Sequence, residues 1–527
     1  MTRKQLLVLL VTCLGFFMIM LDTTIVYVAT PSMITGLHAT LDQVLWVFNG
    51  YLLAYAVLLI TASRLADLWG PRNLFAVGLA VFTIASALCG LSQDSTQLIA
   101  ARVLQGVGGA MLAPQSLTLL TAIFPPERRG AAFGINGAVV GLSTVAGPTL
   151  GGLIVTTADW RWIFFLNVPV GIVAVAASLL VIPDIRPGIR HRMDTIGVAL
   201  ASSTLLLLVF GLIEGQRYDW STVIWALLAG GLVLLVIFLT WEARQQEALV
   251  PLHLFRERNF SLMNWTGAAM QFGMQGIFIP VTIYTQSVLG MTALQSGLTV
   301  APMSLVAGVV APFAGRLADR LGGKYLLMAG LAIFGGGATW VTLSATTTST
   351  SLQFTLPFVV TGVGLGLVFA PMTAMAMQRI TPRDAAAASG LLNTTRQLGG
   401  VMGAAVTGAV LQSQLALALP AQARAASAQL PEQLKSGFVD GFARAARSGL
   451  QVGRGQDGGA QLPAALSAQV RQQLLDLVHS AFANGYLAAM RPTVMVAVAV
   501  LMVAALSCLL VVRRPAPAVT EAQARAA

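Results

Sequence analysis

The sequence reads SRLADLWGPRNLFAVGLAVF at 63–82 and GRLADRLGGKYLLMAGLAIF at 315–334. Ten of the twenty positions in these two segments are identical. The shared positions include Arg64 and Arg316, Asp67 and Asp319, and Gly70 and Gly322. The same offset of 252 residues aligns Gly147 with Gly399, and a shift of four more aligns GVGG at 106 with GVGL at 362. The repeat predicts two homologous halves.

Apolar stretches occupy most of the 527 residues, of which 56% are hydrophobic and only 10% are charged. Runs of 18 or more apolar residues are long enough as helices to cross a hydrocarbon core of about 30 Å. We predict fourteen membrane spans, near 6–30, 44–62, 74–93, 97–121, 131–157, 162–182, 195–213, 221–241, 260–285, 296–315, 325–345, 352–377, 385–411 and 492–512. The pattern is typical of an all-α polytopic membrane protein.

The repeat and the spans together predict a layout of six plus two plus six. If six spans form one half, the second half should begin soon after residue 183, yet its matching residues begin near 260. We therefore predict a six-helix bundle at 1–183, two inserted spans with flanking cytoplasmic loops at 184–259, and a second six-helix bundle at 260–527. The two bundles would be parallel repeats related by an axis along the membrane normal.

The net charge of +11 raises the question of a nucleic-acid partner, but its distribution indicates topology instead. Twenty of the 31 lysines and arginines lie at the termini or in the alternate loops that share a side with them, whereas only Arg161 and Arg217 lie in the short opposite loops. This bias predicts that both termini are cytoplasmic. The three cysteines lie inside apolar runs, so neither a disulfide framework nor a CxxC metal site is expected.

Several motifs resemble one transporter family. They are LDTTIVYVATP at 21–31, SRLADLWGPR at 63–72, RVLQGVGGA at 102–110, GLSTVAGPTLGG at 141–152 and GLLNTTRQLGGVMGAAV at 390–406. In combination, from about Leu6 to Val512, the chain resembles a fourteen-span drug:proton antiporter of the major facilitator superfamily, of the EmrB/QacA type. It departs at Tyr27, where a small polar Asn is expected.

The resemblance implies the major facilitator fold and proton-coupled multidrug efflux of amphiphilic drugs or toxic compounds by alternating access. It also implies a bacterial cytoplasmic (inner) membrane, the lipid bilayer and protons as partners, and no cofactor beyond the proton gradient. A periplasmic adaptor and an outer-membrane channel are candidate partners for which the sequence carries no motif. Two alternatives stay open: export of one natural product or siderophore, and a membrane sensor or scaffold on a transporter fold.

Asp22 is the one acidic residue placed well inside a predicted span. Because burying a carboxylate in a membrane costs several kcal/mol unless it is paired or neutral, such a residue is a functional candidate. Arg102 lies at a similar depth in a span that runs the other way, and Gln105 lies one turn further along. We expect Asp22 to carry the proton and Arg102 with Gln105 to tune its proton affinity. The alternative is a static buried ion pair.

The matching positions of the second half carry no acidic partner: Met274 lies opposite Asp22 in the repeat, and Phe358 lies near the register of Arg102. We predict a substrate cavity walled by Gln105 together with Trp265, Gln271, Phe272, Met274, Gln275 and Arg396. Methionines and aromatic residues can adapt to varied apolar shapes. The alternative for each of them is simple packing.

The repeated charged segments are predicted to be a cytoplasmic gate made of Arg64, Asp67, Gly70, Arg72, Arg316, Asp319 and Gly322. Their charges would latch one bundle to the other, and the glycines would permit tight turns. The alternative is that the basic residues only enforce topology, which leaves the two aspartates unexplained. An antiporter motif is predicted at Gly141, Gly147, Pro148, Gly151 and Gly152, where small residues allow close packing and the proline bends the span.

The residues at 412–490 form the one long predicted non-membrane loop, placed in the periplasm by the topology. Apolar residues recur at helical spacing at 434–446 and 466–486, on either side of GRGQDGGA. This spacing predicts two amphipathic helices, and the alternative is a partly disordered Ala/Gln linker. Enzyme motifs such as HExxH, GxSxG and a complete phosphate-binding loop do not occur, so we expect a transporter and no enzyme.

Overall fold

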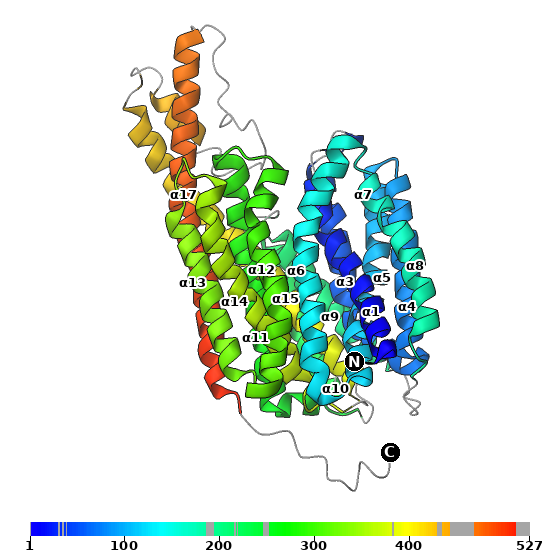
Figure 1. The fold of residues 1–527 in the computed structure, drawn as a ribbon. Helices are drawn as coiled ribbons and strands as arrows, with labels where there is room; N and C mark the ends of the chain where they lie inside the picture. The colour runs from blue at the N-terminus through cyan, green and yellow to red at the C-terminus, as the bar shows by residue number, and fades with distance from the viewer. Residues whose placement is uncertain are drawn as a thin grey trace, which may run out of the picture.

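The computed structural model describes residues 2–29, 32–33, 36–37, 39, 41–185, 194–215, 218, 220–245, 252–381, 384–428, 430, 435–442 and 468–512. Within these ranges the regular elements are all helices. The long helices run side by side through one slab, and the start of α1 and the end of α17 lie on the same side of it (Figure 1). The predicted all-α architecture is therefore confirmed for the described residues.

The helices fall into three groups along the chain. The first is α1 (Arg3–Val28), α3 (Leu41–Trp69), α4 (Pro71–Leu91), α5 (Ser95–Ile123), α6 (Pro126–Thr157), the short α7 (Trp162–Phe165) and α8 (Asn167–Val181). The second is α9 (Thr195–Glu214) and α10 (Thr222–Glu242). The third is α11 (Arg258–Ile283), α12 (Ala293–Leu321), α13 (Lys324–Ser344), α14 (Ser351–Met377), α15 (Ala385–Ser427) and α17 (Ala468–Ser507). Two short helical turns flank α11, namely η1 (Leu252–Arg256) before it and η2 (Tyr284–Val288) after it, and η3 (Cys508–Leu510) follows α17.

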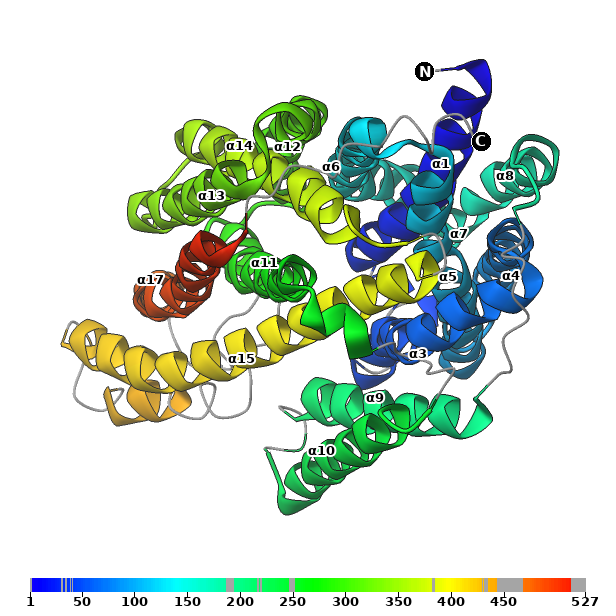
Figure 2. The same cartoon turned by 90° about the horizontal axis from the view of Figure 1, so that it is seen from below.

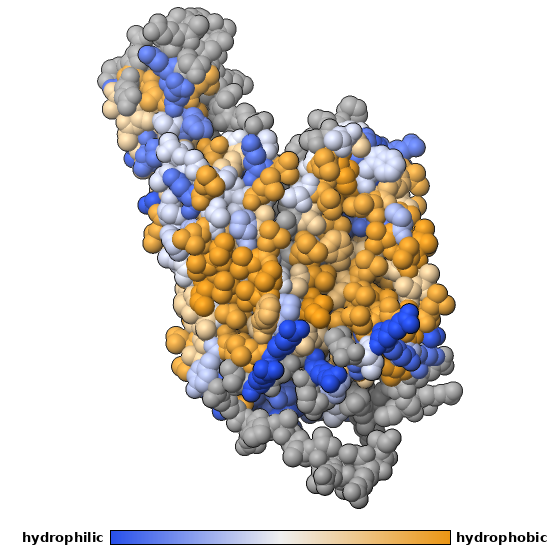
Figure 3. Space-filling view, viewed as in Figure 1, coloured by the Kyte–Doolittle hydropathy of each residue, from blue (hydrophilic) through white to orange (hydrophobic). Residues whose placement is uncertain are grey.

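Twelve helices of the described chain are long and apolar enough to cross a membrane. Leu180 and Leu352 are 85% and 84% exposed. Apolar side chains cover much of the outer surface of the helices, as a bilayer contact requires (Figure 3). The helices α6 and α11 were also predicted to be spans, but they are not among the twelve. Amide side chains lower the hydropathy of α11, and several side chains of α6 lie outside the described residues.

The two halves repeat one close helix packing. In the first half, a Cβ on Gly108 of α5 would lie 2.5 Å from the backbone nitrogen of Phe82 in α4. In the second half, a Cβ on Gly364 of α14 would lie 2.6 Å from the Cα of Phe334 in α13. Only glycine allows backbones to approach this closely. The repeated GVG sequences thus make the same contact in both halves.

The halves meet along α6 and α12 and where α15 crosses α3 and α5. Near the end of α3, Gly390 of α15 packs directly on Ser63, and Ser389 Oγ donates a hydrogen bond of 2.8 Å to the Pro114 carbonyl of α5. The Arg129 guanidinium, at the start of α6, donates to the Met377 carbonyl of α14 at 3.4 Å. These contacts close the side that carries the chain ends, whereas the surface is indented between the halves on the opposite side (Figure 3).

The pair α9 and α10 packs at the edge of the first half (Figure 2). In it, α9 contacts both α10 and α3. Buried Glu214, at the end of α9, accepts a hydrogen bond of 3.5 Å from the Asn49 amide. The helix α9 also contacts α15 of the second half, so the pair lies at the edge of the first half and reaches the second.

The helices on either side of the predicted long loop extend into it. The helix α15 continues past residue 411 to Ser427, and α17 is one helix from Ala468 through the last predicted span. At about 1.5 Å per residue, each helix is longer than a bilayer core, and both project beyond the slab (Figure 1). The alanine-rich sequence from 414 to 427 has high helix propensity, so nothing ends α15 at the predicted position.

The projecting helices have an apolar seam of their own. Phe438 and Phe442 are buried, and their rings lie 5.1 Å apart. Leu419 of α15 contacts Gly485 of α17. The predicted helical spacing is thus confirmed for residues 435–442 and for 468–486, but the second segment is part of α17 and not a separate helix. The glycine-rich GRGQDGGA lies outside the described residues.

Candidate functional site

The structure brings Asp22 and Arg102 together inside the first half. An Arg102 Nη1 donates to Asp22 Oδ2 at 2.5 Å, and both side chains are almost completely buried, at 1% and 0% exposed. They approach from opposite ends of α1 and α5, which run in opposite directions, so their similar predicted depths allow them to meet. A buried pair of this kind is strongly destabilised when only one partner is removed.

Two amides complete the coordination of the Asp22 carboxylate. Gln105 Nε2 donates to Asp22 Oδ1 at 2.9 Å, while the Gln105 Oε1 accepts from Arg102 Nη1 at 2.8 Å. Asn167 Nδ2, at the start of α8, donates to the same Oδ1 at 3.3 Å and to Ser86 Oγ of α4 at 3.1 Å. Both carboxylate oxygens are thus held by donors, as a buried acid requires.

Arg102 has further partners that do not depend on Asp22. Its Nε donates to the Val47 carbonyl of α3 at 3.1 Å. Its guanidinium lies 4.3 Å from the centre of the Tyr51 ring and 5.9 Å from that of Phe164. Cation–π and carbonyl contacts stabilise a desolvated guanidinium. Arg102 therefore keeps favourable contacts if Asp22 becomes neutral.

Sequence reasoning found three members of this network and missed Asn167, Ser86 and Tyr51. An amide inside the apolar run at 162–182 is the signal that could have identified Asn167, because a polar side chain in a span needs a partner. Ser86 and Tyr51 carry no comparable signal, since hydroxyl side chains are common in spans. Tyr27, the predicted departure from the family, has a side chain outside the described residues.

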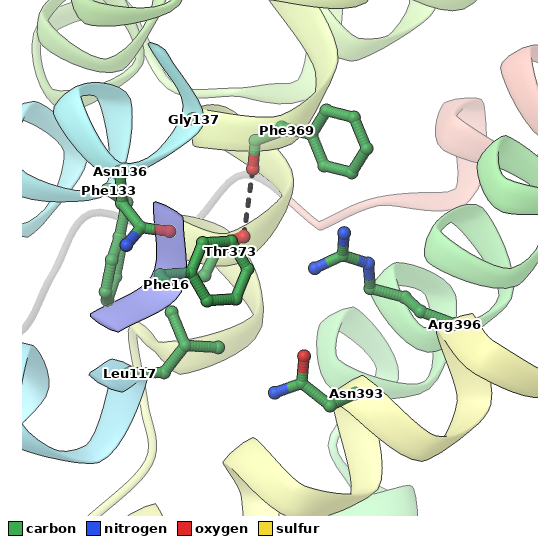
Figure 4. A pocket seen from close by; sticks show the side chains of 9 residues that line it. All are labelled: Phe16, Leu117, Phe133, Asn136, Gly137, Phe369, Thr373, Asn393 and Arg396. Atoms are coloured by element: carbon green, nitrogen blue, oxygen red, sulfur yellow. Dashed lines mark hydrogen bonds between the residues drawn. The ribbon is translucent and has the colours of Figure 1, made fainter. Parts of the chain in front are cut away.

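A second polar group lies in a small pocket between the halves (Figure 4). The pocket holds about 20 Å³ of free volume. Its walls come from α1, α5 and α6 on one side and from α14 and α15 on the other. It is lined by Phe16, Leu117, Phe133, Asn136, Gly137, Phe369, Thr373, Asn393 and Arg396.

Of the residues predicted for the cavity, the structure places Arg396 in this pocket and the others elsewhere. Gln271 and Gln275 lie beside Gly400 of α15, and Met274 packs partly buried against the main core. Phe272 contacts Gly403 through its backbone, Gln105 belongs to the Asp22 network, and Trp265 is 43% exposed. Sequence position alone could not tell which face of α11 meets α15.

The structure describes only part of the predicted cytoplasmic gate. Gly70 and Gly322 have φ of 80° and 82°, the left-handed region that favours glycine, as the predicted tight turns require. Arg72 contacts its neighbour Asn73 and lies 3.9 Å from Asp184 of its own half, and Arg316 lies near Phe313 on its own helix. The side chains of Arg64, Asp67 and Asp319 lie outside the described residues, so the latch stays a prediction.

The antiporter motif packs α6 against the helix that carries Asp22. A Cβ on Gly147 would lie 2.6 Å from the Cβ of Thr24, two residues beyond Asp22. Gly151 is buried, and a Cβ on Gly152 would lie 3.4 Å from Leu294 of α12. Gly141 and the Pro148 ring lie outside the described residues. Among the residues that are described, no cluster of His, Cys, Asp and Glu could hold a metal ion.

Residues 12–193 and 188–404 match the family described as the Major Facilitator Superfamily. The chain is 36% identical over 414 residues to the tetracenomycin C resistance and export protein of Streptomyces glaucescens, covering 78% of this chain and 77% of that protein. It is 30% identical over 506 residues to the multidrug transporter protein MdtP of Bacillus subtilis, covering 92% and 90%. These matches show a membrane transporter of small molecules, and the chain belongs to the Major Facilitator Superfamily.

The solved structure of the proton:xylose symporter XylE has the same fold. It superimposes with a TM-score of 0.55 at 12% sequence identity, over 84% of this chain and 94% of that one. At this identity the likeness concerns the fold alone. The major facilitator fold that the resemblance implies is therefore confirmed, and the members named above are transporters and not enzymes.

Proposed function

We propose that this protein exports amphiphilic compounds in exchange for protons. The observation that carries the proposal is the completely buried Asp22 carboxylate, held by Arg102, Gln105 and Asn167 where several helices of one half meet. A carboxylate at membrane depth is the usual carrier of a proton in a transporter. The similarity to the tetracenomycin C resistance and export protein supports the direction of transport.

Proton exchange follows from the contacts of the network. When Asp22 takes up a proton, its attraction for Arg102 is lost, while Arg102 keeps the Val47 carbonyl, the Gln105 oxygen and the Tyr51 ring. The neutral carboxyl can still accept from the Gln105 and Asn167 amides. Both charge states of Asp22 thus keep hydrogen-bond partners, which is what a site that loads and releases a proton needs.

The network is coupled to the rest of the fold through α1 and α6. Thr24 Oγ1 lies 3.4 Å from the Ser143 carbonyl of α6, and Gly147 allows the two helices to touch. Since α6 also packs along α12 of the second half, a shift of α1 caused by protonation would reach the interface between the halves. Alternating access would then exchange the closed side described here for the opposite one.

The finer topology belongs to the same proposal. We place fourteen spans in a bacterial cytoplasmic membrane, in a six plus two plus six layout with α6 and α11 as interior spans and both termini in the cytoplasm. The excess of Lys and Arg on the terminal side supports this orientation. The helix α6 packs on α1 of its own half and on α12 of the other half, while α11 packs on α15 and α17, and such protein contacts allow a less apolar sequence than lipid contact would.

The test is proton release from acidified inverted vesicles when lipophilic cations, anions and neutral compounds are added, with wild type compared with Asp22→Asn. We expect wild type to release protons with at least one compound and the variant to release none. Release that is unchanged in the variant would contradict the role of Asp22. Release with one compound alone would favour the specialised exporter that the tetracenomycin C relative suggests, and no release with any compound would favour a sensor or scaffold.

A further inference from the structure

Arg396 is a half-buried residue whose guanidinium has no counter-ion among the described residues. Its Nε is completely buried and makes no hydrogen bond. Its contact is the Phe369 ring, whose centre lies 4.8 Å from the guanidinium carbon. By contrast, Arg102, which is 1% exposed, has a carboxylate, an amide and a carbonyl. Leaving a desolvated cation unpaired is costly, and a chain that keeps one needs an anion from elsewhere.

The surroundings of Arg396 suit one end of an amphiphilic molecule. Figure 4 shows the guanidinium pointing into the pocket toward Phe16 and Asn393. Asn393 uses one amide hydrogen on the Ser389 carbonyl at 2.9 Å and has a second hydrogen left. The rings of Phe16, Phe133 and Phe369 supply an apolar wall. The pocket thus combines a fixed positive charge with an aromatic surface.

The position of the pocket lets it respond to the transport cycle. Its lining comes from both halves, so relative movement of the halves changes its size. In the described conformation the free volume of about 20 Å³ is room for a single water-sized molecule. A larger occupant requires the halves to separate, as alternating access provides.

We propose that Arg396 binds an anionic group, a carboxylate or phenolate, of the exported compound, with the apolar part of that compound against the phenylalanine rings. The inference rests on the proposed export function and narrows its substrate class to amphiphilic anions. A guanidinium matches a carboxylate through two parallel hydrogen bonds, whereas it repels a cationic substrate.

Three fluorescent probes with one aromatic body test the proposal: pyrenebutyrate as the anion, pyrenebutanol as the neutral compound and pyrenebutyltrimethylammonium as the cation. Binding to the purified full-length protein is measured by pyrene fluorescence for wild type, Arg396→Gln, Arg396→Lys and Arg491→Gln. Arg491 is the control, because it is an exposed arginine away from the pocket, just before the last predicted span, and its hydrogen bond goes to the Ala345 carbonyl at 3.4 Å. Thermal unfolding of each variant reports whether it is folded.

Wild type should bind pyrenebutyrate more tightly than either other probe. Arg396→Gln should weaken pyrenebutyrate by about 10- to 100-fold, as expected for a lost charge-assisted hydrogen bond, and leave pyrenebutanol within about twofold. Arg396→Lys should keep part of the preference, and Arg491→Gln all of it. An unchanged anion preference in folded Arg396→Gln, equal binding of the three probes by wild type, or no binding of any would overturn the inference.

The experiments distinguish a failure of the anion-site proposal from a failure of the proposed proton-coupled export. Proton-coupled transport of the pyrene cation that is unaffected in Arg396→Gln would leave export intact and contradict the anion site. Binding of pyrenebutyrate that depends on Arg396, without any proton movement, would support the anion site and contradict antiport. Competition by chloride alone, with pyrenebutyrate and pyrenebutanol bound equally, would assign Arg396 to an inorganic ion and overturn the substrate proposal.

Discussion

The contact between Gly390 of α15 and Ser63 of α3 should control which side of the protein is closed. A Cβ on Gly390 would lie 2.6 Å from the Ser63 Cβ and 3.5 Å from the Leu59 carbonyl, on the side that carries the chain ends. Neither neighbour is the free end of a long side chain, so Gly390→Ala must push the two helices apart. Such overpacking costs about 1 to 3 kcal/mol.

Because this contact joins the two halves on one side only, the cost falls on the conformation that is closed there. The equilibrium between the conformation that is closed on the terminal side and the conformation that is open there should then shift by about 5- to 150-fold toward the open one. Spin labels at the exposed Leu68 of α3 and Leu317 of α12, 43% and 41% exposed, report the separation of the halves. We expect double electron–electron resonance to show a smaller short-distance population in Gly390→Ala than in wild type.

Two controls separate this effect from general damage. Gly336→Ala adds a Cβ that meets nothing within 4 Å, so its distance distribution should match wild type. Combining Gly390→Ala with Ser63→Gly removes the clashing side chain and should restore the short distances. A distribution in Gly390→Ala indistinguishable from wild type would refute the claim that this contact closes the terminal side.

Two further substitutions have definite expected outcomes. Asn167→Leu removes a donor 3.3 Å from Asp22 Oδ1. The loss of a hydrogen bond worth about 0.5 to 1.5 kcal/mol should slow proton exchange in inverted vesicles roughly 2- to 10-fold, with little change in the melting temperature. An unchanged exchange rate would show that Asn167 is not part of the proton site. Gly364→Ala places a Cβ 2.6 Å from the Phe334 Cα, so the melting temperature of the purified protein should fall. A melting temperature equal to that of wild type would contradict the tight packing of α13 on α14.

The sequence predicts the fold where physical constraints are strong and local. Long apolar runs identify the helices, and the repeated GVG segments identify a close packing that glycine alone permits. The ends of α15 and α17 could not be predicted from hydropathy, because helices of alanine-rich sequence continue outside the membrane. Likewise α11 is not apolar enough to be recognised as a span by hydropathy alone, because amide side chains interrupt its apolar sequence.

In the candidate site, too, some residues could be predicted from the sequence and others could not. Asp22 and Arg102 are predictable because a charged pair inside spans has few alternatives. The orientation of α11 is set by its packing on α15, so the sequence could not predict that Trp265 is exposed or that Phe16, Asn136 and Thr373 line the pocket that contains Arg396. Arg396 was expected near the substrate, but its pairing with Phe369 follows only from the three-dimensional arrangement.

The account depends most on Asp22 being the group that exchanges its proton when substrate binds. The alternative is that Asp22 and Arg102 form a static pair, which the double variant Asp22→Asn/Arg102→Gln distinguishes. Replacing both partners avoids the unpaired buried charge, about 3 to 5 kcal/mol, that either single substitution leaves. The double variant is therefore expected to fold, and its melting temperature checks this.

The decisive measurement is the number of protons that purified protein releases when a saturating transported compound is added, followed with a pH indicator in weakly buffered solution. Wild type and the control Asp476→Asn, which alters an exposed carboxylate of α17, should release protons. The folded double variant should bind the compound and release none. Release from the double variant equal to that of wild type would contradict the central claim and leave the Asp22 and Arg102 pair as a structural contact.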